Sequence, residues 1–369
     1  AGLSVDRPAV CFYEINGITQ RADHADSYNI YNDLSWQPLL ALARDKSDVI
    51  ISGGTEIIDQ GRKVDIVPAE LVNTVIREEP QGRITRTTIT AGRRTLTSMA
   101  LREKDIDTTW CTEPLLKTAD DLTVWLELPV AELVGTVDTA SVAVVEHELG
   151  NRGCYMLNTP DALCMVAGLF DMETFTIIAM TEPDLFSAAL DKAAAFLEWR
   201  TEQIAAALPG RLWRIYGPEY ASVPYLPPEL FRRYVTDYDR QLCEIIHRHH
   251  GYARLHSHGN LRAILNHIVD TGCMGLDPIE PPPQGDVELK YVREHYGAAM
   301  VLFGNLEAAD LENLQQAEFR EKIRRAIAEG TSGNGRGFVL MPSACPYGRQ
   351  LSVTAMRNYE AMIDEIERL

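Results

Sequence analysis

Short apolar runs alternate with longer amphipathic segments along most of the chain. The apolar runs are about four to eight residues long, which is typical of buried strands. Outside one hairpin they predict strands over residues 8–15, 48–51, 142–145, 212–216, 252–255, 273–276, 299–303 and 338–341. A helical pattern follows each of them, so the repeated unit is a strand and then a helix.

Start and stop signals mark several of the predicted helices. The helix over residues 185–207 begins after Pro183-Asp184, and Gly251 ends the helix over residues 228–250. Further helices are predicted around residues 39–42 and over residues 118–128, 161–170, 261–269, 287–295, 318–329 and 352–367.

Eight strand–helix units in a chain of 369 residues predict an α/β fold. The specific prediction is a (β/α)8 TIM barrel, formed as a single domain by residues 1–369. Residues from about 55 to 140 interrupt the pattern and are expected to form an insertion on the barrel. Within it, residues 72–76 and 84–89 flank Pro80-Gln81-Gly82, which predicts a hairpin.

Composition narrows the range of partners and compartments. The net charge of −18 argues against nucleic acid and anionic membranes, because both need a basic surface. Seven cysteines, an odd number without framework spacing, favour a reducing cytoplasm. No apolar run approaches the length of a membrane span, and the first thirty residues show no signal peptide. The sequence does not indicate an oligomeric state.

A pair of histidines stands at the end of one predicted strand. The active site of a barrel lies where strands lead into helices, and His256 and His258, two residues apart, face the same way. Cys345 follows the last strand. Imidazole and thiolate ligands suit zinc, which needs three or four of them. The sequence therefore predicts a zinc site formed by these three residues.

Other polar residues follow the predicted strands. Glu219 stands in a Gly-Pro-Glu-Tyr loop and is predicted to be a fourth ligand or a catalytic group that handles protons. Glu14, Asp277, Glu280 and Asn305 are predicted to bind substrate. For Asp277 and Glu280 the alternative is a hydrogen bond to one of the histidines.

Two conspicuous features are expected to have no part in the chemistry. His247, His249 and His250 lie in the last turn of a predicted helix, where they complement the helix dipole. Gly333 to Gly337 precedes a strand instead of opening a helix, so a turn is expected there and not a phosphate loop.

These strand ends resemble the uroporphyrinogen decarboxylase (URO-D) superfamily. The similarity extends from Arg7 to the end of the chain. It is carried by Trp213 to Pro228, Leu255-His256-Ser257-His258-Gly259, Leu276-Asp277-Pro278-Ile279-Glu280, Gly304-Asn305-Leu306 and the Cys345 loop.

The closest resemblance is to the cobalamin-dependent methyltransferases of this superfamily. Members of that branch bind zinc with an H-x-C motif on one strand and a later cysteine. His256 matches the histidine, Cys345 matches the later cysteine, and His258 stands where the first cysteine would be. One thiolate fewer leaves the zinc about one charge more positive.

The resemblance implies a zinc-dependent methyltransferase. Such an enzyme moves a methyl group between a corrinoid such as methylcobalamin, carried by a partner protein, and a small-molecule acceptor or donor. The zinc would activate a thiol or polarise the oxygen or nitrogen of a methylated substrate. True decarboxylases carry an arginine-bearing motif after the first strand, where this chain has Phe12 to Gly17, so porphyrinogen decarboxylation is not expected.

Two other functions remain open at this point. One is a metal-assisted decarboxylase or lyase that acts on a small acid, and the other is a non-catalytic barrel with a structural metal. Turnover of methylcobalamin with thiols separates the methyltransferase from both. A metal position open to exchangeable water separates either enzyme from the structural alternative.

Overall fold

The computed structural model describes residues 6–21, 23, 24, 26–333 and 336–369. Asn334 and Gly335, which belong to the turn predicted over Gly333 to Gly337, lie outside the described residues.

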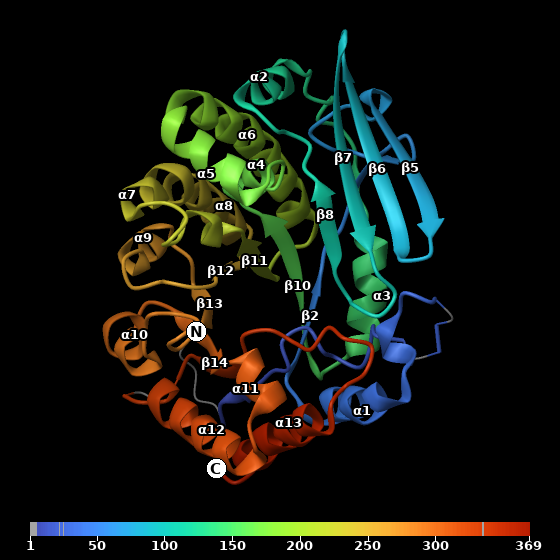
Figure 1. The fold of residues 1–369 in the computed structure, drawn as a ribbon. Coiled ribbons are helices and arrows are strands. Elements are labelled where there is room, and N and C mark those ends of the chain that lie inside the picture. Colours follow the sequence, from blue (N-terminus) through green and yellow to red (C-terminus); the bar gives the residue numbers. More distant parts are fainter. Residues whose placement is uncertain (1–5, 22, 25, 334–335) are drawn as a thin grey trace.

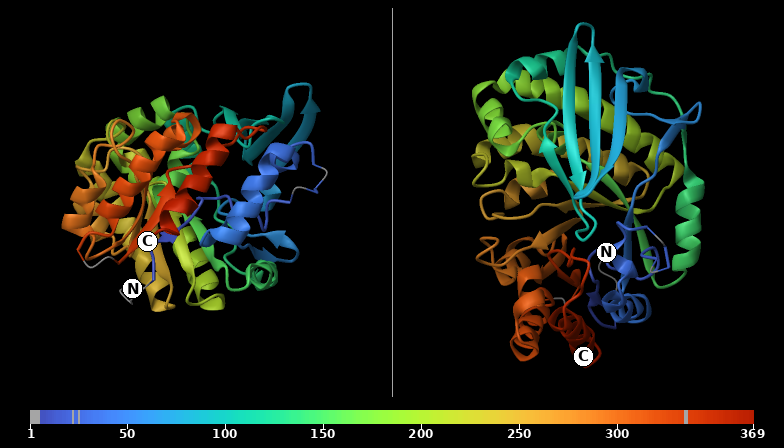
Figure 2. Two further views of the ribbon diagram at one scale, coloured as in Figure 1. Left: turned by 90° about the horizontal axis from the view of Figure 1, so that it is seen from below. Right: turned by 45° about the vertical axis from the view of Figure 1, so that its right-hand side comes forward.

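A curled sheet of eight parallel strands forms the centre of the described chain (Figures 1 and 2). The strands lie in the order β1-β15-β14-β13-β12-β11-β10-β2. Their bounds are β1 (Ala9–Val10), β2 (Val49–Gly53), β10 (Gly153–Pro160), β11 (Leu212–Tyr216), β12 (Tyr252–His256), β13 (Gly275–Ile279), β14 (Val301–Leu306) and β15 (Phe338–Pro342). At the two ends of this order, the N–H of Asp48, the residue before β2, donates to the carbonyl of Val10 in β1 at 2.7 Å. The predicted α/β class is confirmed, and the curled sheet is consistent with a TIM-like barrel.

The strand predicted over Val142–Val145 is wrong, because this segment lies in helix α3 (Thr139–Leu149). The Asp138 carboxylate accepts hydrogen bonds from the N–H groups of Ala140 and Ser141, each at 3.2 Å, and so caps the first turn. The strand preference of valine depends on its surroundings, and here a capped helix overrides it.

Within the eight-stranded sheet, the third strand in chain order is instead β10, which pairs with β2 and β11. Gly153 permits its close approach to β2, because a Cβ there would lie 1.7 Å from the Val49 carbonyl oxygen. The hydrophobic pattern misses this strand because its one apolar run, Cys154 to Leu157, fills only half of it, and the polar pair Asn158-Thr159 and Pro160 follow.

Helices cover the outer face of the sheet, as the strand–helix pattern predicts (Figure 1). They are α1 (Gln37–Lys46), α4 (Ala162–Ala167), α5 (Met172–Thr181), α6 (Pro183–Ala207), α7 (Pro228–Phe231), α8 (Asp237–Arg248), α9 (Leu265–Asp270), α10 (Leu289–Tyr296), α11 (Ala308–Asn313), α12 (Gln316–Gly330) and α13 (Val353–Ile366). Leu242, Ile245 and Ile246 form the buried stripe of α8, which packs near β12. Among the described helices, none is long and apolar enough to cross a membrane.

The segment between β2 and α3 carries two further sheets and helix α2 (Ala119–Glu127). The strands are β3 (Ile57–Asp59), β4 (Arg62–Lys63) and β9 (Thr136–Val137) in one sheet, and β5 (Val72–Glu79), β6 (Gly82–Ala91), β7 (Arg94–Arg102) and β8 (Thr109–Glu113) in the other. The predicted hairpin is β5–β6, with Ile76 opposite Thr85 (Figure 2, right). The turn between β7 and β8 contacts the loop after Cys345, because the Asp107 N–H donates to the Tyr347 carbonyl at 2.7 Å.

Alternate residues of the parallel strands face two separate layers. Trp213 and Leu255 face the helices and belong to the main core. Cys11, Phe303 and Met341 form a small cluster within the curve of the sheet. Polar residues of the same strands share this inner layer, and they build the candidate site.

Candidate active site

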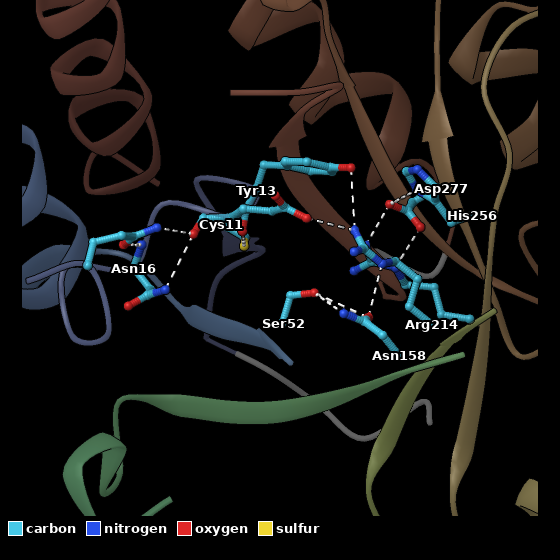
Figure 3. A network of polar contacts seen from close by, with 11 residues as sticks. Cys11, Tyr13, Asn16, Ser52, Asn158, Arg214, His256 and Asp277 are labelled. Atoms are coloured by element: carbon cyan, nitrogen blue, oxygen red, sulfur yellow. Dashed lines mark hydrogen bonds and ion pairs between the residues drawn. The ribbon is translucent and has the colours of Figure 1, made fainter. Parts of the chain in front are cut away.

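Asp277 on β13 is the buried anion at the centre of this site (Figure 3). Nε and Nη2 of Arg254 on β12 donate to its two oxygens, each at 2.6 Å. Nδ1 of His256 lies 3.0 Å from its Oδ2. The strand register explains the arrangement, because His256 pairs with Asp277 and Arg254 pairs with Gly275, which has no side chain.

Asp277 is held in its ionised form. Burial alone would raise its pKa, but the charge of Arg254 and the hydrogen bonds from Arg254 and His256 outweigh burial and hold the pKa of Asp277 below its usual value. An ionised carboxylate only accepts, so His256 donates through Nδ1 and its Nε2 is left for other partners. Asp277 is 0% exposed. Its contact with His256 is the alternative that the sequence leaves open for this residue.

His258 and Glu280 repeat this arrangement beside the first pair. Nδ1 of His258 lies 3.0 Å from Oε1 of Glu280, whose Oε2 accepts from the Gly259 N–H at 2.7 Å. Burial lowers the pKa of His258, but the hydrogen bond and charge of Glu280 outweigh it and raise that pKa. Burial raises the pKa of Glu280, but bonds to His258 and Gly259 outweigh it and lower that pKa. The rings of His256 and His258 are 4.7 Å apart and nearly perpendicular.

Cys345 lies in the loop after β15, half-buried against the main core. Burial, with the nearby charges of Glu14 and Asp107, raises the pKa of its thiol to about 12, so the thiol is neutral. The two imidazoles fit a metal, since each has a carboxylate on Nδ1 as metal-bound histidines usually do. Across the described ranges, however, no three or more His, Cys, Asp or Glu side chains form a group that could hold a metal ion. The predicted set of three ligands is therefore not assembled in this conformation.

Glu219 and Asn305 both lie at or just after the carboxyl end of a strand. Glu219 lies in a 3₁₀ turn (Pro218–Ala221) directly after β11, and its Oε2 is buried without a hydrogen-bond partner. Its negative charge contributes to the raised pKa of His258. Asn305 lies on β14 opposite Met341 and is half-buried.

Glu307 is a candidate catalytic residue that the sequence analysis misses. It follows β14 directly, is 6% exposed, and has a buried Oε1 without a hydrogen-bond partner. Burial, with the charges of Glu280 and Asp310, raises the pKa of Glu307 to about 7. Its position two residues after Asn305 was the available signal, because residues two apart on a strand face the same way.

The sequence matches the family model described as uroporphyrinogen decarboxylase (URO-D) over residues 162–369. This chain belongs to the URO-D family. The matched region contains every predicted site residue except Glu14, so the resemblance inferred from the strand ends is confirmed.

A solved structure extends the likeness of this URO-D family member to the whole fold. The chain is similar to the solved structure of a methyltransferase from Methanosarcina mazei, with a TM-score of 0.58 and 17% sequence identity. The alignment covers 99% of this chain and 96% of that chain. At this identity the likeness concerns the fold. No curated protein matches the sequence.

Arg214 is a second polar residue of the site that the strand ends of this URO-D family member do not indicate (Figure 3). It lies in the middle of β11, where a charged residue interrupts the apolar run Leu-Trp-Arg-Ile-Tyr. Its Nη1 donates to Oε1 of Glu14 at 3.1 Å, and its Nε donates to Oδ1 of Asn158 at 3.1 Å. Glu14, predicted to bind substrate, is thus paired with an arginine at the inner face of the sheet.

Proposed function

We propose that this chain is a methyltransferase that moves a methyl group between a corrinoid on a partner protein and a small-molecule acceptor or donor. The observation that carries the proposal is the pair of imidazoles, His256 and His258, each held through Nδ1 by a buried carboxylate. Membership of the URO-D family and the likeness in fold to a methyltransferase support it.

Zinc is the proposed metal, with His256, His258 and Cys345 as ligands and Glu219 as a fourth ligand or proton-handling group. The metal would supply Lewis acidity toward a thiol or toward a methylated oxygen or nitrogen. Because the described residues do not assemble three ligands, no step of the reaction is assigned to the metal.

Proton transfer is the step that the protein's own residues can perform. An oxygen or nitrogen that loses its methyl group takes up a proton, whereas a thiol acceptor releases one. Glu307, with a pKa of about 7, exists in both protonation states near neutral pH and suits either direction. His258 and Glu280 provide a second proton-bearing pair on the same side.

A decarboxylase that acts on a small acid is the second candidate, and Arg214 is the observation that favours it. Its side chain is 12% exposed at the inner face of the sheet, beside Tyr13 and Asn158. A substrate carboxylate could replace Glu14 as its partner, because an arginine binds carboxylates through paired N–H groups.

Methyl transfer from methylcobalamin to a panel of thiols tests the proposal. We expect turnover by the purified protein that is lost in His256→Ala and retained in His249→Ala. His249 is the matched control because its Nε2 contacts Glu202 at 2.7 Å, away from the site.

The decarboxylase alternative has its own readout. Release of carbon dioxide from a small acid, lost in Arg214→Met, together with no methyl transfer in either direction, would replace the methyltransferase proposal.

A further inference from the structure

A cavity of about 510 Å³ opens at the end of the sheet opposite the histidines. Its walls include the first residues of four neighbouring strands, Leu212, Tyr252, Gly275 and Val301. The first residues of parallel strands lie at one end of a sheet, whereas the histidines lie at the other. The cavity therefore lies apart from the two histidines, although Arg254 both lines it and binds Asp277.

The wall of this cavity is cationic although the chain is acidic overall. Its described lining residues include three arginines and no Asp or Glu, in a chain of net charge −18. Of these arginines, Arg254 is already paired with Asp277, and Arg336 stands at the exposed rim. Met274 and Phe303 contribute apolar surface.

Arg293 on α10 is the third arginine, and its hydrogen bonds are incomplete. It is 8% exposed, and its Nε donates to the Ser332 carbonyl at 3.0 Å. Its Nη1 is buried without a hydrogen-bond partner. A buried charged donor without an acceptor is costly, so an acceptor supplied by a ligand would be stabilised there.

We propose that this cavity binds a small amphipathic monocarboxylate, with its carboxylate on Arg293 and its apolar body against Met274, Val301 and Phe303. The guanidinium matches a carboxylate in charge and geometry. The apolar lining disfavours a strongly hydrated phosphate, which would lose its water without enough replacement donors. The proposal goes beyond the proposed methyltransferase, and Arg293 and the three apolar residues are not among the residues proposed for methyl transfer.

Calorimetric titration of the purified chain with octanoate tests the site. Removing a charge-assisted hydrogen bond should weaken binding by on the order of ten-fold or more, so we expect that loss in Arg293→Met. Lys290→Met is the matched control, because Lys290 lies on the same helix, is 66% exposed and does not line the cavity. Octanol, which has no charge, should bind equally to the wild-type chain and to Arg293→Met.

Three further measurements test whether octanoate binds in this cavity and not elsewhere on the chain. Ala299→Trp, a substitution at the exposed rim, should also weaken octanoate binding and covers the case in which Arg293→Met does not fold. His256→Ala should bind octanoate like the wild-type chain, which separates this site from the proposed active site. Unchanged octanoate binding in both Arg293→Met and Ala299→Trp, or binding of inorganic phosphate in its place, would overturn the proposal.

Discussion

Nδ1 of His256 lies 3.0 Å from Oδ2 of Asp277, and the same carboxylate accepts both hydrogen bonds from Arg254. One buried anion thus balances a buried cation and sets the orientation of an imidazole. The stability of this part of the sheet and the geometry of the site therefore depend on a single charge.

Asp277→Asn keeps the size of the side chain and removes this charge. Arg254, whose side chain is 3% exposed, would lose its counter-ion, and breaking a buried pair in this way costs about 3–5 kcal/mol. We expect that loss in the free energy of unfolding measured with urea. Asp237→Asn is the control: its partner Arg240 is 38% exposed, so the cost should stay below about 1 kcal/mol. Equal losses in the two variants would contradict the role of Asp277.

The same carboxylate should make the free energy of unfolding fall at acidic pH. Because its pKa is lower in the folded chain, its contribution is complete above its unfolded pKa of about 3.9 and is lost as the pH falls through the folded value. Below about pH 4, the wild-type free energy of unfolding should therefore approach that of Asp277→Asn. A constant difference between the two chains down to strongly acidic pH would refute this.

Much of the fold could be predicted because its signals are local. Strands β11 to β15 are apolar runs bounded by turn residues, and their predicted ranges lie within a few residues of the observed ones. The third strand could not be found in this way. Val142, Val144 and Val145 favour a strand by composition, while the cap at Asp138 and the close contact of Gly153 with Val49 depend on local and tertiary geometry.

The candidate site was predictable as a set of strand ends but not as a set of contacts. Parallel strands bring their carboxyl ends together, so His258 and Glu280 could be expected to lie near each other. The pairing of Arg214 with Glu14 joins residues 200 positions apart and depends on the register of the whole sheet. Cys345 lies in a loop after its strand, and the path of such a loop has no periodicity from which to predict it.

Metal content gives a direct test of the predicted ligands. We expect about one zinc ion for each purified chain, because imidazole and thiolate ligands suit zinc. His256→Ala or Cys345→Ala should lower the occupancy about ten-fold or more, measured by plasma mass spectrometry at equal protein concentration. His249→Ala should keep the metal. Full occupancy in the double variant His256→Ala, Cys345→Ala would show that these residues do not hold the metal.

Uroporphyrinogen should not be converted to coproporphyrinogen. Its several carboxylates need several cations that are free to pair, but Arg254 is bound to Asp277, and Arg214 could accept only one carboxylate in place of Glu14. The segment Phe12 to Gly17 adds no arginine. Product separation with fluorescence detection measures the conversion, and coproporphyrinogen above the level of a protein-free blank would show that the inner arginines do accept this substrate.

Glu307 should make the free energy of unfolding depend on pH with the opposite sign from Asp277. Its pKa rises from 4.5 to about 7 in the folded chain, so between these values the folded state holds a proton that the unfolded state has released. Stability contributed by this proton is complete below about pH 4.5 and is lost as the pH rises through about 7. Glu307→Gln cannot ionise, so this slope should disappear in urea unfolding experiments between about pH 5 and 8.

The rate of methyl transfer and its pH profile test whether Glu307 takes part in proton transfer. If Glu307 donates a proton to the heteroatom that loses its methyl group, the rate should fall above about pH 7, and Glu307→Gln should be slower by on the order of 100-fold. Glu318→Gln is the control, because Glu318 is exposed on α12 and should change neither the slope nor the rate. A Glu307→Gln chain that loses the stability slope but keeps the wild-type rate and pH profile would show that this carboxyl is buried for structure and takes no part in proton transfer.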